Sequence, residues 1–182
     1  VLNKMGAQIE GIGTSSLTIH GVKELRPVNV RTIPDMIEAG TFLMAGALMG
    51  RITLNKVDPS HLSIVTQKLE QAGATLGIND ESITIEKCNE LQAVDITTDV
   101  HPGFPTDLQA QWIALMSVAN GTSHITDTIY NDRFSHVPEL NRLGAKITLK
   151  KNRAFVTGVK TLKGAPVMST DIRASASLVI AA

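Results

Sequence analysis

The feature that most constrains the fold is an internal repeat. Three segments start at Pro34 (PDMIEAGTFLMAGALMGRITL), Thr106 (TDLQAQWIALMSVANGTSHIT) and Thr170 (TDIRASASLVIAA). Each places an Asp second, before apolar and small residues in a helical pattern. These Asp residues, at positions 35, 107 and 171, are 72 and 64 residues apart (107 − 35 and 171 − 107). Repeats of this length predict a fold assembled from copies of one supersecondary unit.

A second alignment covers the other half of the unit. Segments from Leu2 (LNKMGAQIEGIGTSSLTIHG), Leu69 (LEQAGATLGINDESITIEK) and Leu140 (LNRLGAKITLKKNRAFVTG) share one pattern. Each reads as a helix end, a Gly–Ala pair and two strand-like runs around a polar turn. The chain is therefore predicted to hold the tail of one repeat, two whole repeats and the head of another. We expect it to be a piece of a longer repetitive protein.

One complete unit can be followed from Asp35, the expected N-cap of a helix that is apolar on nearly all sides and therefore buried. Gly73 is the expected C-cap of a second, amphipathic helix. The predicted order is helix, strand, helix, hairpin and strand, over residues 35–49, 51–57, 59–73, 75–86 and 93–100. The second copy should repeat this order over 107–169. Three such units around a pseudo-threefold axis would give an α/β fold, an inverted barrel with buried helices inside and sheets outside.

Composition excludes several classes of protein. The 17 basic and 17 acidic residues are spread without blocks, which gives no electrostatic footprint for nucleic acid or an anionic membrane. Cys88 is the single cysteine, so an internal disulfide is impossible and a reducing cytoplasm is the expected location. The five histidines show no metal-ligand spacing, and we expect neither a metal nor another cofactor.

Three motifs carry a resemblance that runs over the whole chain. HPGFPTDLQAQ, NDRFSHVPELNRLGA and STDIRASASLV are similar to signatures of the UDP-N-acetylglucosamine enolpyruvyl transferases, and they fall in that family's order. The resemblance implies transfer of enolpyruvyl from phosphoenolpyruvate to the 3-hydroxyl of UDP-N-acetylglucosamine, with release of phosphate. In that family this is the first committed step of peptidoglycan synthesis, on which cell-wall biogenesis, cell shape and division depend.

The resemblance also implies a domain layout. The family's enolpyruvyl transferase fold has two domains of three repeats each, with the active site in the cleft between them. Residues 1–30 would end the first domain and cross over. Residues 31–182 would hold two repeats of the second, at about 35–100 and 107–169, and the start of another at 170–182. The family's reactive cysteine lies outside this segment, so we expect the chain alone to be inactive without the remainder of the enzyme.

Asp107 is the strongest candidate for catalysis. By resemblance it binds the sugar 3-hydroxyl and is a proposed base, a role that a carboxylate can fill near a reacting hydroxyl. The alternative is an N-cap of the helix that follows, worth about 1 kcal/mol. One carboxylate oxygen could cap while the other faces the cleft, so both roles are compatible.

The other candidates are substrate-binding residues by resemblance. Arg133 would position reactant or intermediate, with a surface arginine at a helix start as the alternative. Ile129 would present its backbone carbonyl to the nucleotide sugar. Asp171 would contact the intermediate and Arg173 would organise nearby charges, with an N-cap and an early-helix arginine as alternatives. Asp35 is either an N-cap or a further cleft-facing carboxylate.

Two positions depart from the family's pattern. Asn131–Asp132 stand where the family commonly has Glu–Asn, so no role is carried over to those two side chains.

Two alternative functions are considered for the chain: the related enolpyruvylshikimate phosphate synthase reaction and a non-enzymatic repeat scaffold. The FPTDLQAQ and TDIRASASL segments favour the amino-sugar enzyme over the first. A scaffold would not explain charged residues at the same helix-start position in successive repeats.

Overall fold

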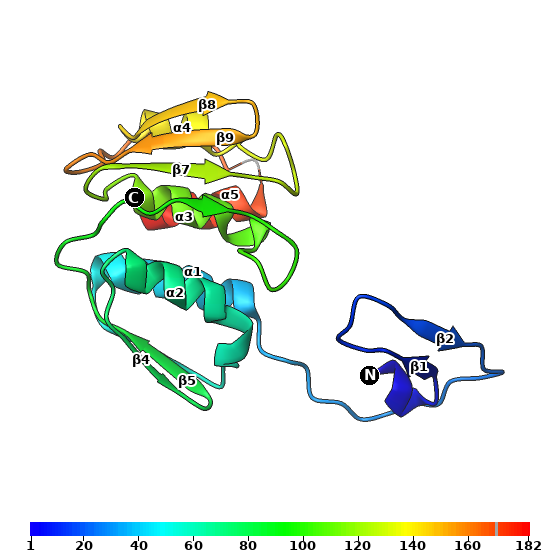
Figure 1. Cartoon of the computed structure of the whole chain (residues 1–182). Helices are drawn as coiled ribbons and strands as arrows, with labels where there is room; N and C mark the ends of the chain where they lie inside the picture. Colours follow the sequence, from blue (N-terminus) through cyan, green and yellow to red (C-terminus); the bar gives the residue numbers. More distant parts are fainter. Residues whose placement is uncertain (170) are drawn as a thin grey trace. The chain divides into compact units, whose positions relative to one another are not determined.

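The computed structural model describes residues 1–169 and 171–182 in two units, Val1–Ile33 and Pro34–Ala182 (Figure 1). The smaller unit contains a short 3-10 helix, η1 (Leu2–Met5), and an antiparallel hairpin of β1 (Gln8–Glu10) and β2 (Thr18–His20). The GIGTSS segment lies in the turn of that hairpin, where the sequence predicts a turn. Thr170, at which the third copy of the helix segment is expected to begin, lies outside the described residues.

The larger unit contains two copies of one order of elements. The first consists of α1 (Met36–Met49), β3 (Ile52–Asn55), the 3-10 turn η2 (Pro59–Leu62), α2 (Ser63–Gln71), β4 (Leu76–Asn79), β5 (Ser82–Ile85) and β6 (Ile96–Thr97). The second consists of η3 (Thr106–Leu108), α3 (Gln109–Met116), β7 (Thr122–Thr126), α4 (Val137–Arg142), β8 (Lys146–Lys150) and β9 (Arg153–Thr157). Helix α5 (Ile172–Ala181) follows. The predicted helix, strand, helix and hairpin are present in both copies.

The strands of the larger unit form two sheets, and the second sheet takes a strand from the first copy. The first sheet has the order β3–β5–β4 and is antiparallel. The second has the order β6–β7–β9–β8, in which β6 runs parallel to β7. The predicted strand at 93–100 is shorter than expected, because only Ile96 and Thr97 pair with β7. The segment 158–169 forms no strand, and the described residues of the larger unit form no third sheet with which it could pair.

The Gly–Ala pairs build the same corner in all three copies. Gly6, Gly73 and Gly144 have φ values of 100°, 96° and 92°, in the left-handed region that favours glycine after a helix. In each copy the N–H of the following alanine donates to a helix carbonyl: Ala7 to Leu2, Ala74 to Leu69 and Ala145 to Leu140. The carbonyl before each glycine accepts from the N–H of a distant residue: Met5 from Arg26, Ala72 from Gln92 and Leu143 from Lys163. The sequence repeat is therefore also a repeat of backbone hydrogen bonds.

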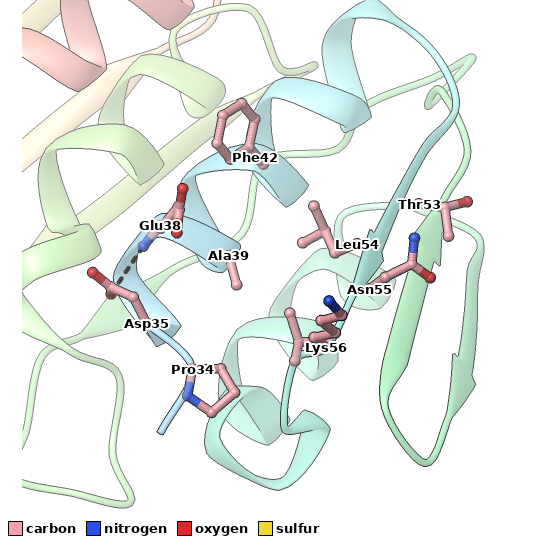
Figure 2. Close-up of a pocket in the computed structure, with 10 residues that line it drawn as sticks. Pro34, Asp35, Glu38, Ala39, Phe42, Thr53, Leu54, Asn55 and Lys56 are labelled. Atoms are coloured by element: carbon pink, nitrogen blue, oxygen red, sulfur yellow. Dashed lines mark hydrogen bonds between the residues drawn. The ribbon is translucent and has the colours of Figure 1, made fainter. Parts of the chain in front are cut away.

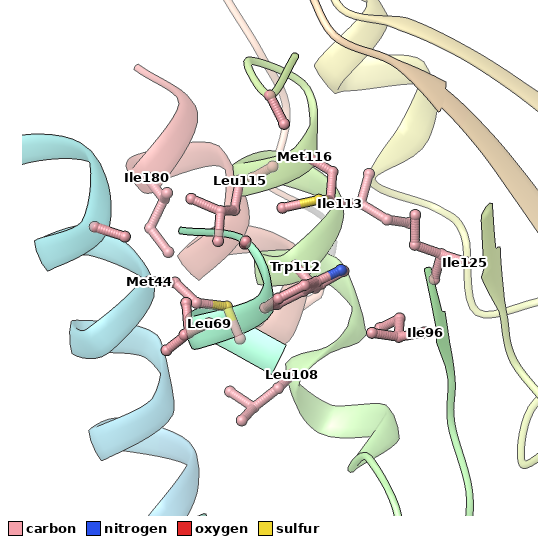
Figure 3. Close-up of a cluster of buried hydrophobic side chains, with 14 of the residues drawn as sticks. Met44, Leu69, Ile96, Leu108, Trp112, Ile113, Leu115, Met116, Ile125 and Ile180 are labelled. Atoms are coloured by element: carbon pink, nitrogen blue, oxygen red, sulfur yellow. The ribbon is translucent and has the colours of Figure 1, made fainter. Parts of the chain in front are cut away.

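Helices α1, α3 and α5 lie between the two sheets (Figure 1). Trp112 on α3 is fully buried among apolar side chains from several elements (Figure 3). Its ring meets Phe104 edge-on, at 5.5 Å between centroids, and its Nε1 donates to the Val94 carbonyl at 3.2 Å. The expected arrangement of helices inside and sheets outside is confirmed.

Small residues allow α1 to approach its neighbours closely. A Cβ added to Gly40 would lie 2.4 Å from a Leu108 methyl, and one added to Gly46 would lie 2.4 Å from an Ile85 methyl. The expectation that α1 is buried on nearly all sides is wrong, however. Phe42 is 49% exposed and Met49 is 64% exposed, because no described element covers that face of the helix. Within the described residues, no helix is long and apolar enough to cross a membrane.

A glycine in the second copy offers a test of this packing. A Cβ on Gly158 would lie 1.6 Å from the Ala119 carbonyl oxygen, so Gly158→Ala must displace the backbone. We expect this change to lower the free energy of unfolding of the complete protein by roughly 1–3 kcal/mol. Gly164→Ala is the matched control, because its Cβ would meet nothing within 4 Å, and it should change stability by less than about 0.5 kcal/mol. Urea denaturation measures both, and equal midpoints for the two variants would contradict the close approach.

Candidate active site

Asp107 lies inside the 3-10 turn η3, which leads directly into α3. The residue at the N-cap position of this turn is Pro105, and no Asp107 side-chain hydrogen bond caps either helix. The capping interpretation of Asp107 is therefore wrong. The turn begins at Thr106, two residues earlier than an N-cap at Asp107 requires, and the Asp107 side chain contacts two arginines instead.

The Asp107 carboxylate is shared by Arg133 and Arg173. Arg133 Nη1 lies 3.1 Å from Asp107 Oδ1, and Arg173 Nε lies 2.5 Å from the same oxygen. Arg133 precedes α4 and Arg173 is in the first turn of α5, so the two arginines come from different parts of the chain. Both contacts use Oδ1, which leaves Oδ2 without a hydrogen-bond partner among the described residues. The carboxylate is thus fixed on one side and available on the other.

Arg133 is held by several groups besides Asp107. Its guanidinium carbon lies 4.1 Å from the centroid of the Tyr130 ring, a cation–π distance. Its Nη1 donates to Thr106 Oγ1 at 3.0 Å, and its backbone carbonyl accepts from Gln109 Nε2 at 3.3 Å. The side chain is only 19% exposed and lies four positions before α4 begins. The alternative of a surface arginine at a helix start is therefore wrong.

Asp127 is a buried carboxylate next to this cluster that sequence reasoning missed. Its Oδ1 accepts from the Thr98 hydroxyl at 2.8 Å and from the backbone N–H groups of Ile129 and Tyr130 at 2.9 Å each. Its Oδ2 accepts from the Thr106 hydroxyl at 2.7 Å. The side-chain oxygen accepting from N–H groups two and three residues later is an Asx-type turn. The sequence signal that could have predicted this turn is the Asp at the start of the segment DTIY.

Asp171 caps α5 beside the same cluster. Its carboxylate accepts from the backbone N–H of Arg173 at 2.7 Å, as the capping alternative predicts. That hydrogen bond is the main reason why the pKa of Asp171 lies below its usual range, and the charges of Arg173 and Arg133 lower this pKa further. Arg173 sits in a helix first turn, where a cation is unfavourable. The carboxylates of Asp107 and Asp171 offset that cost.

A pocket of about 350 Å³ opens beside Asp107. Asp107, Thr106 and Ile129 lie in its wall. The remaining wall residues come from the start of α1 and from the segment before η3: Met36, Ile37, Asp99, Val100, His101, Gly103 and Pro105. The wall is mainly apolar and includes two carboxylates, Asp99 and Asp107, which is the character of a small-molecule site.

Asp35 stands apart from this cluster. Its Oδ1 accepts from the N–H groups of Ile37 at 2.8 Å and Glu38 at 3.2 Å, so it caps α1. It lines a separate pocket of about 320 Å³ between α1 and β3, together with Glu38, Phe42 and Lys56 (Figure 2). The structure therefore brings together Asp107, Arg133, Arg173 and Asp171, with Ile129 at the pocket wall, and leaves Asp35 elsewhere.

Two buried groups lie outside the cluster's hydrogen bonds. His136 is 2% exposed, and its Nε2 has no hydrogen-bond partner among the described residues. Burial lowers the pKa of His136 to about 4, although the charge of Asp171 acts in the opposite direction. Cys88 is also buried, and burial raises the pKa of its thiol, which fits a structural role. Among the described residues, no group of His, Cys, Asp and Glu is arranged to hold a metal ion.

Comparison with known proteins places the chain in a family. The family model for EPSP synthase (3-phosphoshikimate 1-carboxyvinyltransferase) matches residues 1–182. UDP-N-acetylglucosamine 1-carboxyvinyltransferase of Myxococcus xanthus is 54% identical over 182 residues, which are 100% of this chain and 43% of that protein. The protein of the same name from Desulfosudis oleivorans is 53% identical over 182 residues, 100% of this chain and 44% of its own. The chain thus spans less than half the length of these relatives.

Solved structures agree on the fold. The enolpyruvyl transferase NikO from Streptomyces tendae matches 98% of this chain and 44% of its own, with a TM-score of 0.85 and 29% sequence identity. EPSP synthase from Acinetobacter baumannii matches with a TM-score of 0.69 at 19% identity, which concerns the fold alone. The inner helices and outer sheets therefore belong to the enolpyruvyl transferase class of structure. The chain is a member of the EPSP synthase (3-phosphoshikimate 1-carboxyvinyltransferase) family.

The buried imidazole of His136 predicts a pH dependence of stability. Its folded-state pKa of about 4 lies below the ordinary value of 6.5, so between these pH values the unfolded chain binds a proton that the folded chain does not. Stability should therefore fall as the pH falls from 6.5 to 4. His136→Gln removes the titrating group, and the wild type should lose up to about 3 kcal/mol more than this variant over that range. Urea unfolding of the complete protein at several pH values checks this, and parallel pH curves for the two proteins would refute it.

Proposed function

We propose that the protein containing this chain transfers the enolpyruvyl group of phosphoenolpyruvate to the 3-hydroxyl of UDP-N-acetylglucosamine, with release of phosphate. The observation that carries the proposal is the Asp107–Arg133–Arg173 cluster, found in a chain that is 54% identical to a relative named for this carboxyvinyl transfer. Because the chain spans 43% of that relative, we propose that the remainder of the same enzyme completes the site. We further propose that the reaction belongs to peptidoglycan synthesis in the cytoplasm.

The chemistry assigns a role to each member of the cluster. Addition of the sugar oxygen to C2 of phosphoenolpyruvate releases the hydroxyl proton and places a proton on C3, which gives a tetrahedral phospholactyl intermediate. Elimination then removes a C3 proton and breaks the bond between C2 and the phosphate oxygen. Asp107 is the proposed acceptor of the hydroxyl proton through Oδ2, because Oδ1 is occupied by the two arginines. Arg133 and Arg173 place positive charge where the anionic intermediate would form.

The remaining candidates have binding roles in this proposal. Ile129 lies in the wall of the pocket beside Asp107, which suits a backbone contact with the nucleotide sugar. Asp171 lies next to Arg173 at the start of α5, within reach of the charges that would hold the intermediate. We assign Asp35 no chemistry beyond its cap, because its carboxylate lies outside the cluster.

Ligand-dependent melting separates this function from its rivals. A ligand that binds only the folded protein raises the melting temperature by mass action. UDP-N-acetylglucosamine should therefore raise the melting temperature of the complete protein, whereas shikimate 3-phosphate at the same concentration should not. A response to the shikimate compound alone would favour the enolpyruvylshikimate phosphate synthase reaction. No response to either would favour a non-enzymatic scaffold.

The role of Asp107 is tested by Asp107→Asn in the complete protein. The amide oxygen can still accept hydrogen bonds from Arg133 and Arg173, but the side chain cannot accept a proton as a carboxylate does. We expect kcat to fall by roughly 10²-fold or more, the usual range for a lost general base, with nearly unchanged melting. Phosphate release with both substrates measures kcat.

A matched control is available at a carboxylate that caps a helix start and makes its contacts with nearby residues in the sequence. Asp58 accepts from the N–H of Ser60 at 3.0 Å at the start of η2, and Asn caps about as well as Asp. Asp58→Asn should leave both kcat and melting near the wild-type values. Near-normal turnover of Asp107→Asn would show that Asp107 is not the base. A large drop in its melting temperature would instead assign the carboxylate a structural role.

A further inference from the structure

The Asp127 carboxylate is buried and meets no arginine or lysine directly among the described residues. Burial of a carboxylate is costly unless hydrogen bonds replace its water. The Asp127 carboxylate accepts four such bonds, at 2.7–2.9 Å, from two hydroxyls and two backbone N–H groups. A group with this many short contacts has little freedom to move. Asp127 therefore provides a fixed point beside the Asp107 cluster.

The Thr106 hydroxyl links Asp127 to Arg133 by two hydrogen bonds. A carboxylate can only accept hydrogen bonds and a guanidinium can only donate them. The single hydroxyl proton of Thr106 must therefore go to Asp127 Oδ2, at 2.7 Å, and its lone pair accepts from Arg133 Nη1, at 3.0 Å. The donor–acceptor direction is thus set throughout, from Arg133 to Thr106 to Asp127.

Asp127 acts on Arg133 by a second route. It holds the backbone N–H of Tyr130, and the Tyr130 ring lies 4.1 Å under the Arg133 guanidinium. The same Arg133 Nη1 that donates to Thr106 also donates to Asp107 Oδ1, at 3.1 Å. Two contacts that depend on Asp127 thus determine where Arg133 meets Asp107. Thr106 is also the chain neighbour of Asp107, so fixing one residue constrains the other.

We propose that Asp127 and Thr106 are positioning residues that orient Arg133, and with it Asp107, for the transfer reaction. The proposal rests on the proposed function for its kinetic consequences but on the hydrogen bonds alone for its geometry. We call the chain of hydrogen bonds from Arg133 through Thr106 to Asp127 the relay. Neither the Asp127 carboxylate nor the Thr106 hydroxyl needs to touch substrate, because both groups already hydrogen-bond within the protein. Their effect is to hold a reacting carboxylate and a cation in one mutual orientation.

The test uses Thr106→Val in the complete protein, since valine keeps the shape of threonine and removes its hydroxyl. Thr106→Ala is made in parallel, because it removes the hydroxyl without adding a methyl group in its place. Thr106→Ser keeps the hydroxyl and should restore function. Thr122→Val is the matched control, because the Thr122 hydroxyl pairs only with Thr157 on the exposed face of β7 and β9.

Two measurements are made on each variant. The first is steady-state kinetics with UDP-N-acetylglucosamine and phosphoenolpyruvate. Loss of the relay should lower kcat about 10- to 100-fold in the Val and Ala variants, with much smaller changes in KM, because the orientation matters most in the transition state. The Ser variant and the Thr122 control should stay within about threefold of the wild type.

The second measurement needs no activity. Nitrogen-15 NMR of the arginine side chains reports how freely the Arg133 guanidinium rotates, and Arg133→Lys identifies its signal. Rotation should be faster in Thr106→Val and Thr106→Ala and return to the wild-type rate in Thr106→Ser. If the wild-type protein fails to transfer enolpyruvyl to UDP-N-acetylglucosamine, the proposed function fails, whereas this signal still tests the relay.

Three outcomes would overturn the proposal. One is a wild-type Arg133 signal in both hydroxyl-free variants. Another is equal impairment of the Ser and Val variants, which would show that the shape of the side chain matters and not its hydroxyl. The third is a lower melting temperature of Thr106→Val with unchanged kcat and unchanged Arg133 rotation, which would make the Thr106 hydroxyl structural only.

Discussion

The complete burial of α3 is the constraint on which the rest of the structure depends. All eight residues from Gln109 to Met116 are buried, including two glutamines. A helix without an exposed face cannot slide or rotate without breaking contacts on every side, because protein interiors are close-packed. The turn η3, with Thr106 and Asp107, therefore leads into a helix whose position is fixed, with Trp112 buried at its centre.

The candidate site follows from where the inner helices begin. Asp107 lies at the start of α3 and Arg173 at the start of α5, and these helices pack against each other. Residues 66 positions apart in the sequence therefore meet as an ion pair. An Asp also precedes the first helix of the series, but the Asp35 carboxylate accepts hydrogen bonds from the backbone N–H groups of Ile37 and Glu38 in α1. Equivalent positions in a repeat thus carry different chemistry.

The sequence predicts the helices and strands and most residues of the Asp107 cluster, but it does not predict which of these residues contact one another. The repeat predicted the helices that begin after Asp35 and Asp171, because a cap is a local interaction. It failed at Asp107, whose partners Arg133 and Arg173 are distant in the sequence. It missed Asp127 for the same reason, since the contacts of Asp127 with Thr98 and Thr106 span 29 and 21 residues. The pairing of β6 with the next copy's sheet is likewise a non-local choice.

The Gly–Ala corner that recurs in the three repeats separates the hairpin of each repeat from its helices. A backbone hydrogen bond, such as that from Gln92 to Ala72, closes the chain around each hairpin, so the hairpin tip lies outside the packed helices. The tips differ in length, with residues 11–17 between the strands of the first hairpin and residues 80–81 between those of the second. The closing bond is present in both cases. Because loop entropy grows only slowly with length, insertions at these tips cost little and leave the spacing of the inner helices unchanged.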